Sequence, residues 1–310
     1  MASFSFHEGL PEGLNFRVDV GIFHHPKHLA LQAAAGWHSF YIRKESAVEG
    51  LVHFNIHEEE ALSPYRSPFG SFIFSDAVDQ SVLHDFVSYC EDKLTAQSVR
   101  HIALKHWPEV YSPDKSNRLE HMLRASGYQV AGEETSAVIS VTEKSFESGL
   151  HRSEKKRLRK CRESNLTFDV MPMDHLQKVY IFLESCRKEK GYSLSMSFPE
   201  IGQLARAFPD NLLLTTVSDK NQLAAANISV QVYDDVLYNF YHDHSAEYDH
   251  VSPVVLLNEG LYSYCQQHQI RLLDLGTSNL GGKLNESLLN FKLRLGALAA
   301  RKLTFTKNLE

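Results

Sequence analysis

The chain shows one order of strand-like and helix-like segments twice, and this order constrains its fold more than any single motif does. In the first half, four short runs of β-branched and aromatic residues are separated by Gly, Pro, Ser and acidic residues, which predicts an antiparallel sheet. These runs are residues 16–20, 39–43, 51–56 and 71–75. A helix, a strand, a helix ended by a glycine and a last strand are expected to follow. They are residues 77–94, 99–105, 115–125 and 136–141.

The second half repeats this order after additional helices at its start. Helices are expected at 151–164, 173–188 and 198–208, and strands at 211–217, 222–232 and 235–241. A helix at 253–268, a strand at 270–275, a helix at 286–295 and a final strand at 302–306 complete it. We therefore expect an α+β protein with two tandem domains, 1–142 and 143–310, each a mostly antiparallel sheet flanked by helices. The shared order suggests an ancient duplication.

Composition places the chain among soluble globular proteins. Of its 310 residues, 43% are hydrophobic and 23% are charged, and its net charge of -6 is unlike that of a general nucleic-acid binder. The four cysteines lie far apart, which argues against a disulfide framework and a zinc site and fits a reducing compartment. Neither a signal-like start nor a run of about 18 apolar residues is present, so we expect a cytoplasmic protein without a membrane span.

Ionisable and small residues lie at and just after the end of the expected strand at 270–275. Asp274, Gly276, Thr277 and Ser278 lie at its end, and Lys292 lies on the next helix. Open sheets usually bind ligands where strands end. This region is therefore a predicted site, with Thr277 and Ser278 as candidate substrate contacts.

Three motifs accompany this order of elements: the basic helix 151–161 followed by 166–170, the Pro-rich loop 63–70, and the pattern of Asp274-Leu275-Gly276 followed by Leu288, Phe291-Lys292 and Gly296. The order and the motifs together resemble the GNAT acyltransferase fold in tandem, as in the FemAB-type branch that includes the aminoacyltransferases that form peptidoglycan bridges. The resemblance implies a transferase that moves an acyl or aminoacyl group onto a small-molecule or peptide-like amine. It covers most of the chain.

The resemblance also implies a role for the lysine of the Phe-Lys pair. Lys292 would stabilise the charge that develops on the carbonyl oxygen, as an oxyanion donor does. A lysine that covers apolar surface with its stem is the alternative. Asp274 would orient Lys292 or accept a proton, or it is a structural carboxylate that caps the loop after the strand.

Aromatic and histidine side chains end the expected strand 235–241, which the resemblance implies diverges from the strand at 270–275. They are Tyr238, Tyr241, His242, Asp243 and His244. Tyr241 or His242 is a candidate general acid or base, and Tyr238 is a candidate substrate contact. A polar strand end facing solvent is the alternative. His242 and His244 lack a third ligand at suitable spacing, so no metal is expected.

Two basic features are candidate anion sites. The run from Arg152 to Arg162 includes Arg157 and would bind a phosphate group, or it is a solvated helix face. Arg66 lies in the Pro-rich loop, whose rigidity suits the binding of an anion. The sequence from His24 to His28 is interrupted by a proline and is interpreted as a surface turn.

The loop before the helix at 253–268 departs from the acetyl-CoA-dependent pattern. Residues 245–253 contain no glycine, whereas a pyrophosphate at a helix N-terminus needs a closely approaching backbone. Acyl-CoA is therefore expected only in an atypical site. Aminoacyl-tRNA is the other candidate donor, but the chain lacks the long helical hairpin that often binds tRNA in the resembled family, so tRNA is not favoured. A catalytically silent GNAT-like protein that binds a small molecule or a partner is the alternative function, and the oligomeric state stays open.

Overall fold

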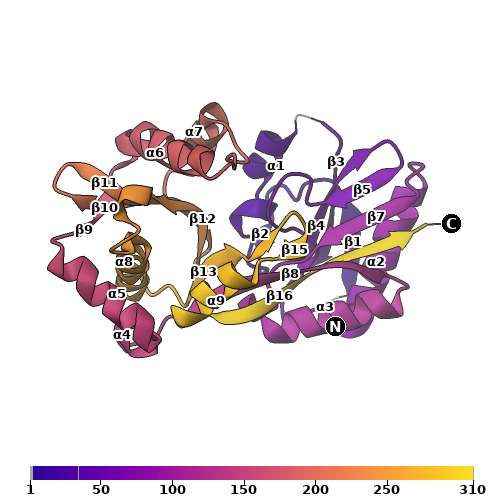
Figure 1. Cartoon of the computed structure of the whole chain (residues 1–310). Helices are drawn as coiled ribbons and strands as arrows, with labels where there is room; N and C mark the ends of the chain where they lie inside the picture. The colour runs from indigo at the N-terminus through magenta and orange to yellow at the C-terminus, as the bar shows by residue number, and fades with distance from the viewer. Residues whose placement is uncertain (1–2, 34, 310) are drawn as a thin grey trace. The chain divides into compact units, whose positions relative to one another are not determined.

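The computed structural model describes residues 3–33 and 35–309, and its contacts divide the chain into two compact units. The first unit is Met1–Glu134 together with Ala300–Glu310, and the second is Thr135–Ala299 (Figure 1). These bounds differ from the two halves expected from the sequence, because the final strand belongs to the first unit.

The first unit is built on a sheet that is mostly antiparallel. Its strands follow the order β1 (Phe4–Glu8), β3 (Trp37–Lys44), β4 (Ala47–His57), β5 (Glu60–Ser63), β7 (His101–Lys105) and β16 (Leu298–Asn308). The short strands β2 (Asn15–Phe16) and β6 (Ile73–Phe74) pair with β4. Its helices are α1 (Pro26–Gln32), α2 (Gln80–Thr95) and α3 (Pro113–Ala125), with 3-10 turns at Ile22–His24 and Glu109–Tyr111. Strand β16 runs antiparallel to β7, so the chain returns to this unit only at its end.

Helix α2 shows how the sequence pattern produces the core of this unit. Asp79 caps the helix by accepting a hydrogen bond of 2.9 Å from the backbone N–H of Val82. Its buried residues recur at helical spacing, so one face of the helix packs on the sheet. They are Leu83, Phe86, Val87, Cys90 and Leu94.

The interpretation of the segment from His24 to His28 as a surface turn is wrong. The segment forms a 3-10 turn and the start of α1, and His24 and His28 are buried. The neighbouring Ile22, Phe23 and Leu29 are core residues and draw the segment inward. A neutral imidazole can be buried with these residues because it forms hydrogen bonds with buried partners. Nε2 of His24, for example, lies 3.0 Å from the backbone oxygen of Ser71.

The second unit has a sheet in the order β8, β13, β12, β11, β10 and β9. The strands are β8 (Gln129–Ser140, which begins in the first unit), β9 (Thr167–Met171), β10 (Leu212–Asp219), β11 (Gln222–Tyr233), β12 (Val236–His244) and β13 (Leu272–Thr277). All neighbours are antiparallel except β12 and β13, which are parallel. These two strands pair only from Val236 and Leu272 to Tyr238 and Asp274, and beyond that point they diverge.

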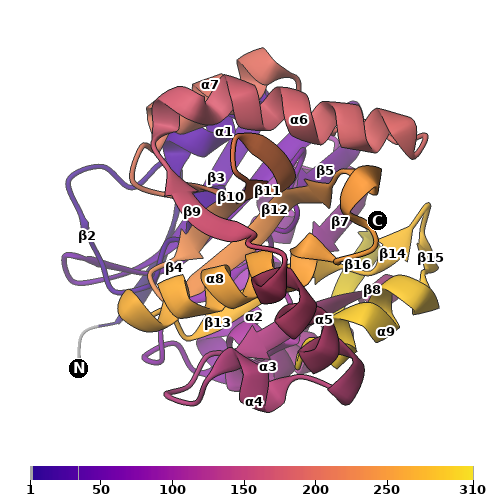
Figure 2. The same ribbon diagram turned by 60° about the vertical axis from the view of Figure 1, so that its left-hand side comes forward.

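Helices cover both faces of this sheet. Helices α6 (Leu176–Glu189) and α7 (Phe198–Ala207) lie on one side, and α8 (Pro253–Gln267), α5 (Arg152–Glu163) and α4 (Phe146–Gly149) lie on the other (Figure 2). A 3-10 turn at Ala246–Tyr248 precedes α8, and another at Met173–His175 precedes α6. The hairpin of β14 (Asn279–Leu280) and β15 (Lys283–Leu284) leads into α9 (Glu286–Arg294). The expected class, mostly antiparallel sheets flanked by helices, is confirmed.

Close packing of α8 on β9 makes a testable prediction at Gly260. A Cβ atom added there would lie 2.2 Å from Cδ2 of Phe168, which no real contact allows. We expect Gly260→Ala to destabilise the second unit by about 1–3 kcal/mol, although alanine is the better helix former. Chemical unfolding followed by far-ultraviolet circular dichroism measures this. Gly149→Ala is the matched control, since its Cβ would meet nothing within 4 Å; equal stability of the two variants would refute the packing argument.

Candidate functional site

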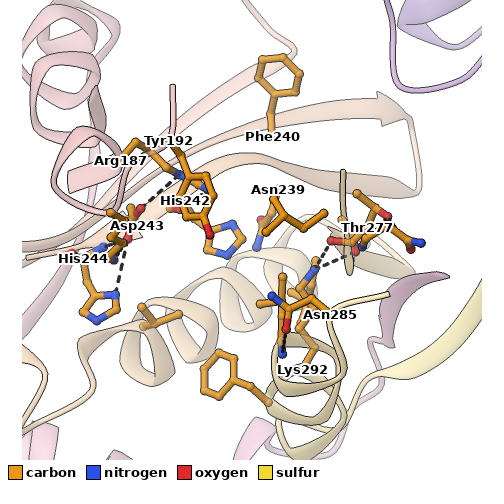
Figure 3. Close-up of a pocket in the computed structure, with 18 of the residues that line it drawn as sticks. Arg187, Tyr192, Asn239, Phe240, His242, Asp243, His244, Thr277, Asn285 and Lys292 are labelled. Atoms are coloured by element: carbon orange, nitrogen blue, oxygen red, sulfur yellow. Dashed lines mark hydrogen bonds and ion pairs between the residues drawn. The ribbon is translucent and has the colours of Figure 1, made fainter. Parts of the chain in front are cut away.

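A cavity of about 440 Å³ lies in the second unit, where β12 and β13 diverge. Its wall comes from the end of α6 and the segment after it, from β12, from the end of β13 and from the hairpin and helix α9 that follow (Figure 3). Of the residues proposed from the sequence, Lys292, His242, Tyr238 and Thr277 line it. The divergence of two neighbouring strands thus creates the space that their side chains and the next helix enclose.

Lys292 is held at the inner wall of the cavity by backbone carbonyl groups. Its side chain is buried, and Nζ donates hydrogen bonds to the oxygens of Gly276 at 2.9 Å and Thr277 at 2.8 Å. Gly276 has a φ of 76°, a left-handed conformation that glycine adopts without strain. An ammonium group has three N–H donors. Two are used by these carbonyls, so one N–H is left for a ligand in the cavity.

Burial lowers the pKa of Lys292 to about 8, and the negative charge of Asp274 opposes part of this effect. Lys292 is therefore still mostly protonated at neutral pH. Asp274 is fully buried, and its Oδ1 accepts a hydrogen bond of 2.7 Å from the N–H of Gly276. Asp274 thus acts on Lys292 in two ways, through its charge and by fixing the backbone whose carbonyl holds the ammonium group.

The ring of His242 faces the cavity from β12 (Figure 3). Burial of the ring, together with the positive charges of Lys292 and Arg187, lowers the pKa of His242 to about 3. The imidazole is therefore neutral at pH 7. Among the residues that the structure describes, none forms a hydrogen bond with this ring. A neutral ring nitrogen is thus available to a ligand.

Tyr241 does not line the cavity. Successive residues of a strand point to opposite faces, so the inward position of His242 turns Tyr241 away. Its hydroxyl group lies 2.6 Å from Oγ of Ser195 and accepts a hydrogen bond of 2.9 Å from the N–H of Met196. Tyr241 therefore anchors the segment between α6 and α7, which also carries Tyr192 at the cavity wall.

We expect Tyr241→Phe to loosen this segment without altering Lys292 or His242. The variant leaves the half-buried N–H of Met196 without its acceptor, which costs about 1 kcal/mol of stability. It should weaken ligand binding in the cavity. Tyr264→Phe on α8 is a control outside the cavity lining. A ligand affinity of Tyr241→Phe equal to that of Tyr264→Phe would contradict the anchoring role.

Besides Tyr241, four other residues proposed from the sequence lie outside the cavity lining. Asp274 and Ser278 are fully buried beside it. Arg157 lies on α5, where its Nη1 is 3.0 Å from Oε2 of Glu154, so it serves a salt bridge within the helix. Arg66 belongs to the first unit.

The sequence reasoning missed two cations at the cavity. Arg187 and Lys190 come from the end of α6 and line the wall beside Asp243. Basic residues at the end of a helix commonly interact with its own carbonyl groups, so their presence alone carried no signal. The spacing of three residues, which places both on one side of the helix end, was the signal that could have been used.

The loop before α8 does not fit the pyrophosphate of CoA in the ordinary manner. The N–H groups of Tyr248, Asp249, Val251, Ser252 and Val255 all donate to oxygens within the loop or the first turn of the helix. Residue 253 is a proline and has no N–H. The expectation that any CoA would bind atypically therefore gains a physical basis, because these amide groups are not directed at a ligand.

Neither a metal cluster nor a membrane-spanning helix is found in the described part of the chain. No group of three or more His, Cys, Asp or Glu side chains within it has an arrangement that could hold a metal ion. Within the same residues, each helix is too short or too polar to cross a bilayer.

The fold and this cleft between two diverging strands define a tandem GNAT architecture. A scan of protein-family models finds no match, and a search of curated sequences finds none either. Solved structures do match in fold. The crystal structure of FemX aligns over 94% of this chain and 93% of that chain, with 12% identity and a TM-score of 0.71.

Two further structures show the same fold. The C-terminal domain assigned to a lysylphosphatidylglycerol synthetase of Agrobacterium fabrum has 12% identity and a TM-score of 0.57, over 84% of this chain and 81% of that one. A tandem GNAT protein from the clavulanic acid biosynthesis pathway has 9% identity and a TM-score of 0.53, over 99% of both chains. The resemblance to FemAB-like and GNAT-type proteins is thus confirmed at the level of the fold.

Proposed function

We propose that this protein is an N-acyltransferase that moves an acyl or aminoacyl group onto an amine in the cavity of the second unit. The observation that carries the proposal is the arrangement of Lys292, a buried and mostly protonated ammonium group with one N–H left for the cavity. A donor fixed in a water-poor wall stabilises a developing oxyanion far better than a donor in water does. The alternative expected from the sequence, a lysine that covers surface with its stem, does not agree with this burial.

The proposed reaction needs no covalent enzyme intermediate. The amine nitrogen of the acceptor attacks the carbonyl carbon of the donor, an N–C bond forms, and Lys292 donates a hydrogen bond to the oxygen that becomes negative. The bond between the carbonyl carbon and the sulfur or oxygen of the leaving group then breaks. Atoms and charge balance when the proton lost by the nitrogen reaches the leaving group.

His242 is the proposed carrier of that proton. Its ring is neutral and faces the cavity, so it can accept the proton from the attacking nitrogen. In the protein without substrate, the low pKa of His242 would make this ring a weak base. Negative charge on the nearby oxyanion raises this pKa during the reaction, because an opposite charge favours the protonated ring. Asp274 is a positioning residue that keeps Lys292 protonated and oriented.

Two donors remain candidates, and the loop before α8 separates them. Its internally bonded amide groups disfavour acyl-CoA held through its pyrophosphate, so acyl-CoA would have to bind elsewhere. An aminoacyl ester, such as aminoacyl-tRNA, does not need that loop. The acceptor is proposed to be a small-molecule or peptide-like amine.

The same loop favours a second candidate function, a catalytically silent protein that binds a ligand in this cavity. One experiment separates the two. The full chain is incubated with acetyl-CoA, longer acyl-CoAs or charged tRNA, each with and without a mixture of amines, and donor consumption is followed. Consumption of a donor that depends on the amines supports the transferase. Binding of a donor or amine without any consumption would favour the silent protein and refute the transferase.

A further inference from the structure

One end of the cavity carries an excess of positive charge. Arg187 and Lys190 approach Asp243 there, with Nε of Arg187 at 3.1 Å from Oδ2 and Nζ of Lys190 hydrogen-bonded to Oδ1. Figure 3 shows Arg187 and Asp243 at the side of the cavity opposite Lys292. Two cations share one carboxylate, so this end has a net positive charge before any ligand binds.

The carboxylate of Asp243 has no capacity left to neutralise more charge. It is largely buried, and its Oδ1 also accepts a hydrogen bond of 2.8 Å from the N–H of His244. The ring of His244 is paired in turn with Asp249, at 2.8 Å. The nearby acidic groups are therefore engaged, and Asp243 serves to fix the two cations in place.

The two cations still have N–H groups to offer. Nη2 of Arg187 donates to the backbone oxygen of His242 at 3.1 Å, whereas Nη1 has no partner among the described residues. The side chains of Arg187 and Lys190 are 33% and 36% exposed, so both can reach a ligand. An arginine beside a lysine suits a phosphate or carboxylate group, which accepts several charge-assisted hydrogen bonds at once.

We propose that the substrate bound in this cavity carries a phosphate or carboxylate group that binds Arg187 and Lys190, while its reacting group lies at Lys292. This inference rests on the proposed function for the placement of the reacting group, but the anion site itself does not depend on transfer. The amide groups of the loop before α8 are bonded internally and do not offer an anion site. The proposed anion site of this cavity lies instead at the C-terminal end of α6.

Calorimetric titration of the full chain with three matched amines tests the proposal in the absence of any donor. Phosphoethanolamine and β-alanine carry an amine and an anionic group, whereas ethanolamine carries the amine alone. We expect at least one of the two anionic probes to bind about tenfold more tightly than ethanolamine, as hydrogen bonds between charged groups allow. The tighter of the two identifies phosphate or carboxylate as the preferred group. Added salt should reduce this preference.

Lys190→Gln is the decisive variant, because Asp243 keeps Arg187 as its partner and no buried charge is left alone. It should lose most of the preference for the anionic probes, and Arg187→Lys, which keeps the charge but not the forked geometry, should lose part of it. Lys188→Gln is the control, since Lys188 lies on the same helix outside the cavity lining. Equal binding of all three probes, no binding at all, or identical behaviour of Lys190→Gln and Lys188→Gln would overturn the proposal. Anion binding without transfer in the donor experiment would refute the proposed function alone.

Discussion

Replacing Lys292 with methionine should lower the maximal rate of transfer by about 10²–10³-fold, the usual effect of removing one oxyanion donor. Methionine fills a similar volume but has no N–H to give to the carbonyl oxygen of the donor. Binding of the acceptor should change little, because the anion site at Arg187 and Lys190 is untouched. Steady-state rates at saturating donor and acceptor measure the effect.

The same substitution should leave the fold intact, which makes the loss of rate interpretable. Lowering the pKa of a lysine from 10.5 to about 8 corresponds to roughly 3 kcal/mol of unfavourable burial of the charge, which methionine removes. Against this, the carbonyl oxygens of Gly276 and Thr277 lose their donor, at about 1–3 kcal/mol each, and the buried carboxylate of Asp274 loses a nearby positive charge. These terms offset each other in part, so the protein should stay folded with a moderately lower melting temperature. Lys283→Met, on the exposed hairpin, is the control and should keep full activity.

The first unit should unfold in mild acid because it buries four neutral histidines. Burial lowers the pKa of His24 and His28 to about 4, and that of His53 and His106 to about 3. Nδ1 of His24 and Nδ1 of His106 have no partner among the described residues, so a proton there would remain unsatisfied. The unfolded chain binds these protons at its ordinary pKa of about 6.5. Stability is therefore complete above pH 6.5 and is lost as the pH falls below that value.

The expected loss is steep. Each histidine contributes about 1.4 kcal/mol per pH unit between its folded and unfolded pKa values, so the four together contribute about 5.6 kcal/mol per unit. A domain of ordinary stability, about 5–15 kcal/mol, should then unfold near pH 5. Tryptophan fluorescence reports this unit alone, since the two tryptophans of the chain, Trp37 and Trp107, both lie in it.

Two variants test the source of this acid sensitivity. His53→Gln removes one of the four buried titrating groups, so the unfolding free energy should depend less steeply on pH. His84→Gln is the control, because His84 is exposed on α2 and should leave the slope unchanged. Tryptophan fluorescence of a folded first unit persisting to pH 4, with a slope indifferent to His53, would show that the histidines do not set its stability.

The sequence predicted most elements of the fold because their signals are local. The apolar spacing in α2 and the strand-turn-strand pattern of β10 to β12 are carried by neighbouring residues. Helix α1 was missed because its histidines and Pro26 have the composition of a turn, and only tertiary burial makes it part of the core. The partner of β16 could not be predicted, since pairing with β7 joins segments about two hundred residues apart.

The part of the site that comes from consecutive elements was also predictable from the sequence. Asp274, Gly276 and Lys292 lie in a strand, a loop and a helix that follow each other directly, so their proximity follows from the chain. The side on which Tyr241 points could not be decided, because β12 contains register shifts that change which residues face the cavity. Arg187 and Lys190 reach the site from a helix that is distant in sequence. Their role depends on Asp243, which the sequence does not place beside them.

The pH dependence of the maximal transfer rate tests the central claim most directly, namely that a protonated Lys292 polarises the donor carbonyl. In the wild-type protein the rate should fall as the pH rises above about 8, where Lys292 loses its proton. Lys292→Arg, whose side chain stays protonated at all these values, should be slower at pH 7 but should not show this fall. Asp274→Asn should move the fall to lower pH, since a neutral residue no longer raises the pKa of Lys292. A wild-type rate that keeps rising to pH 10, or one that falls identically in Lys292→Arg, would contradict the account.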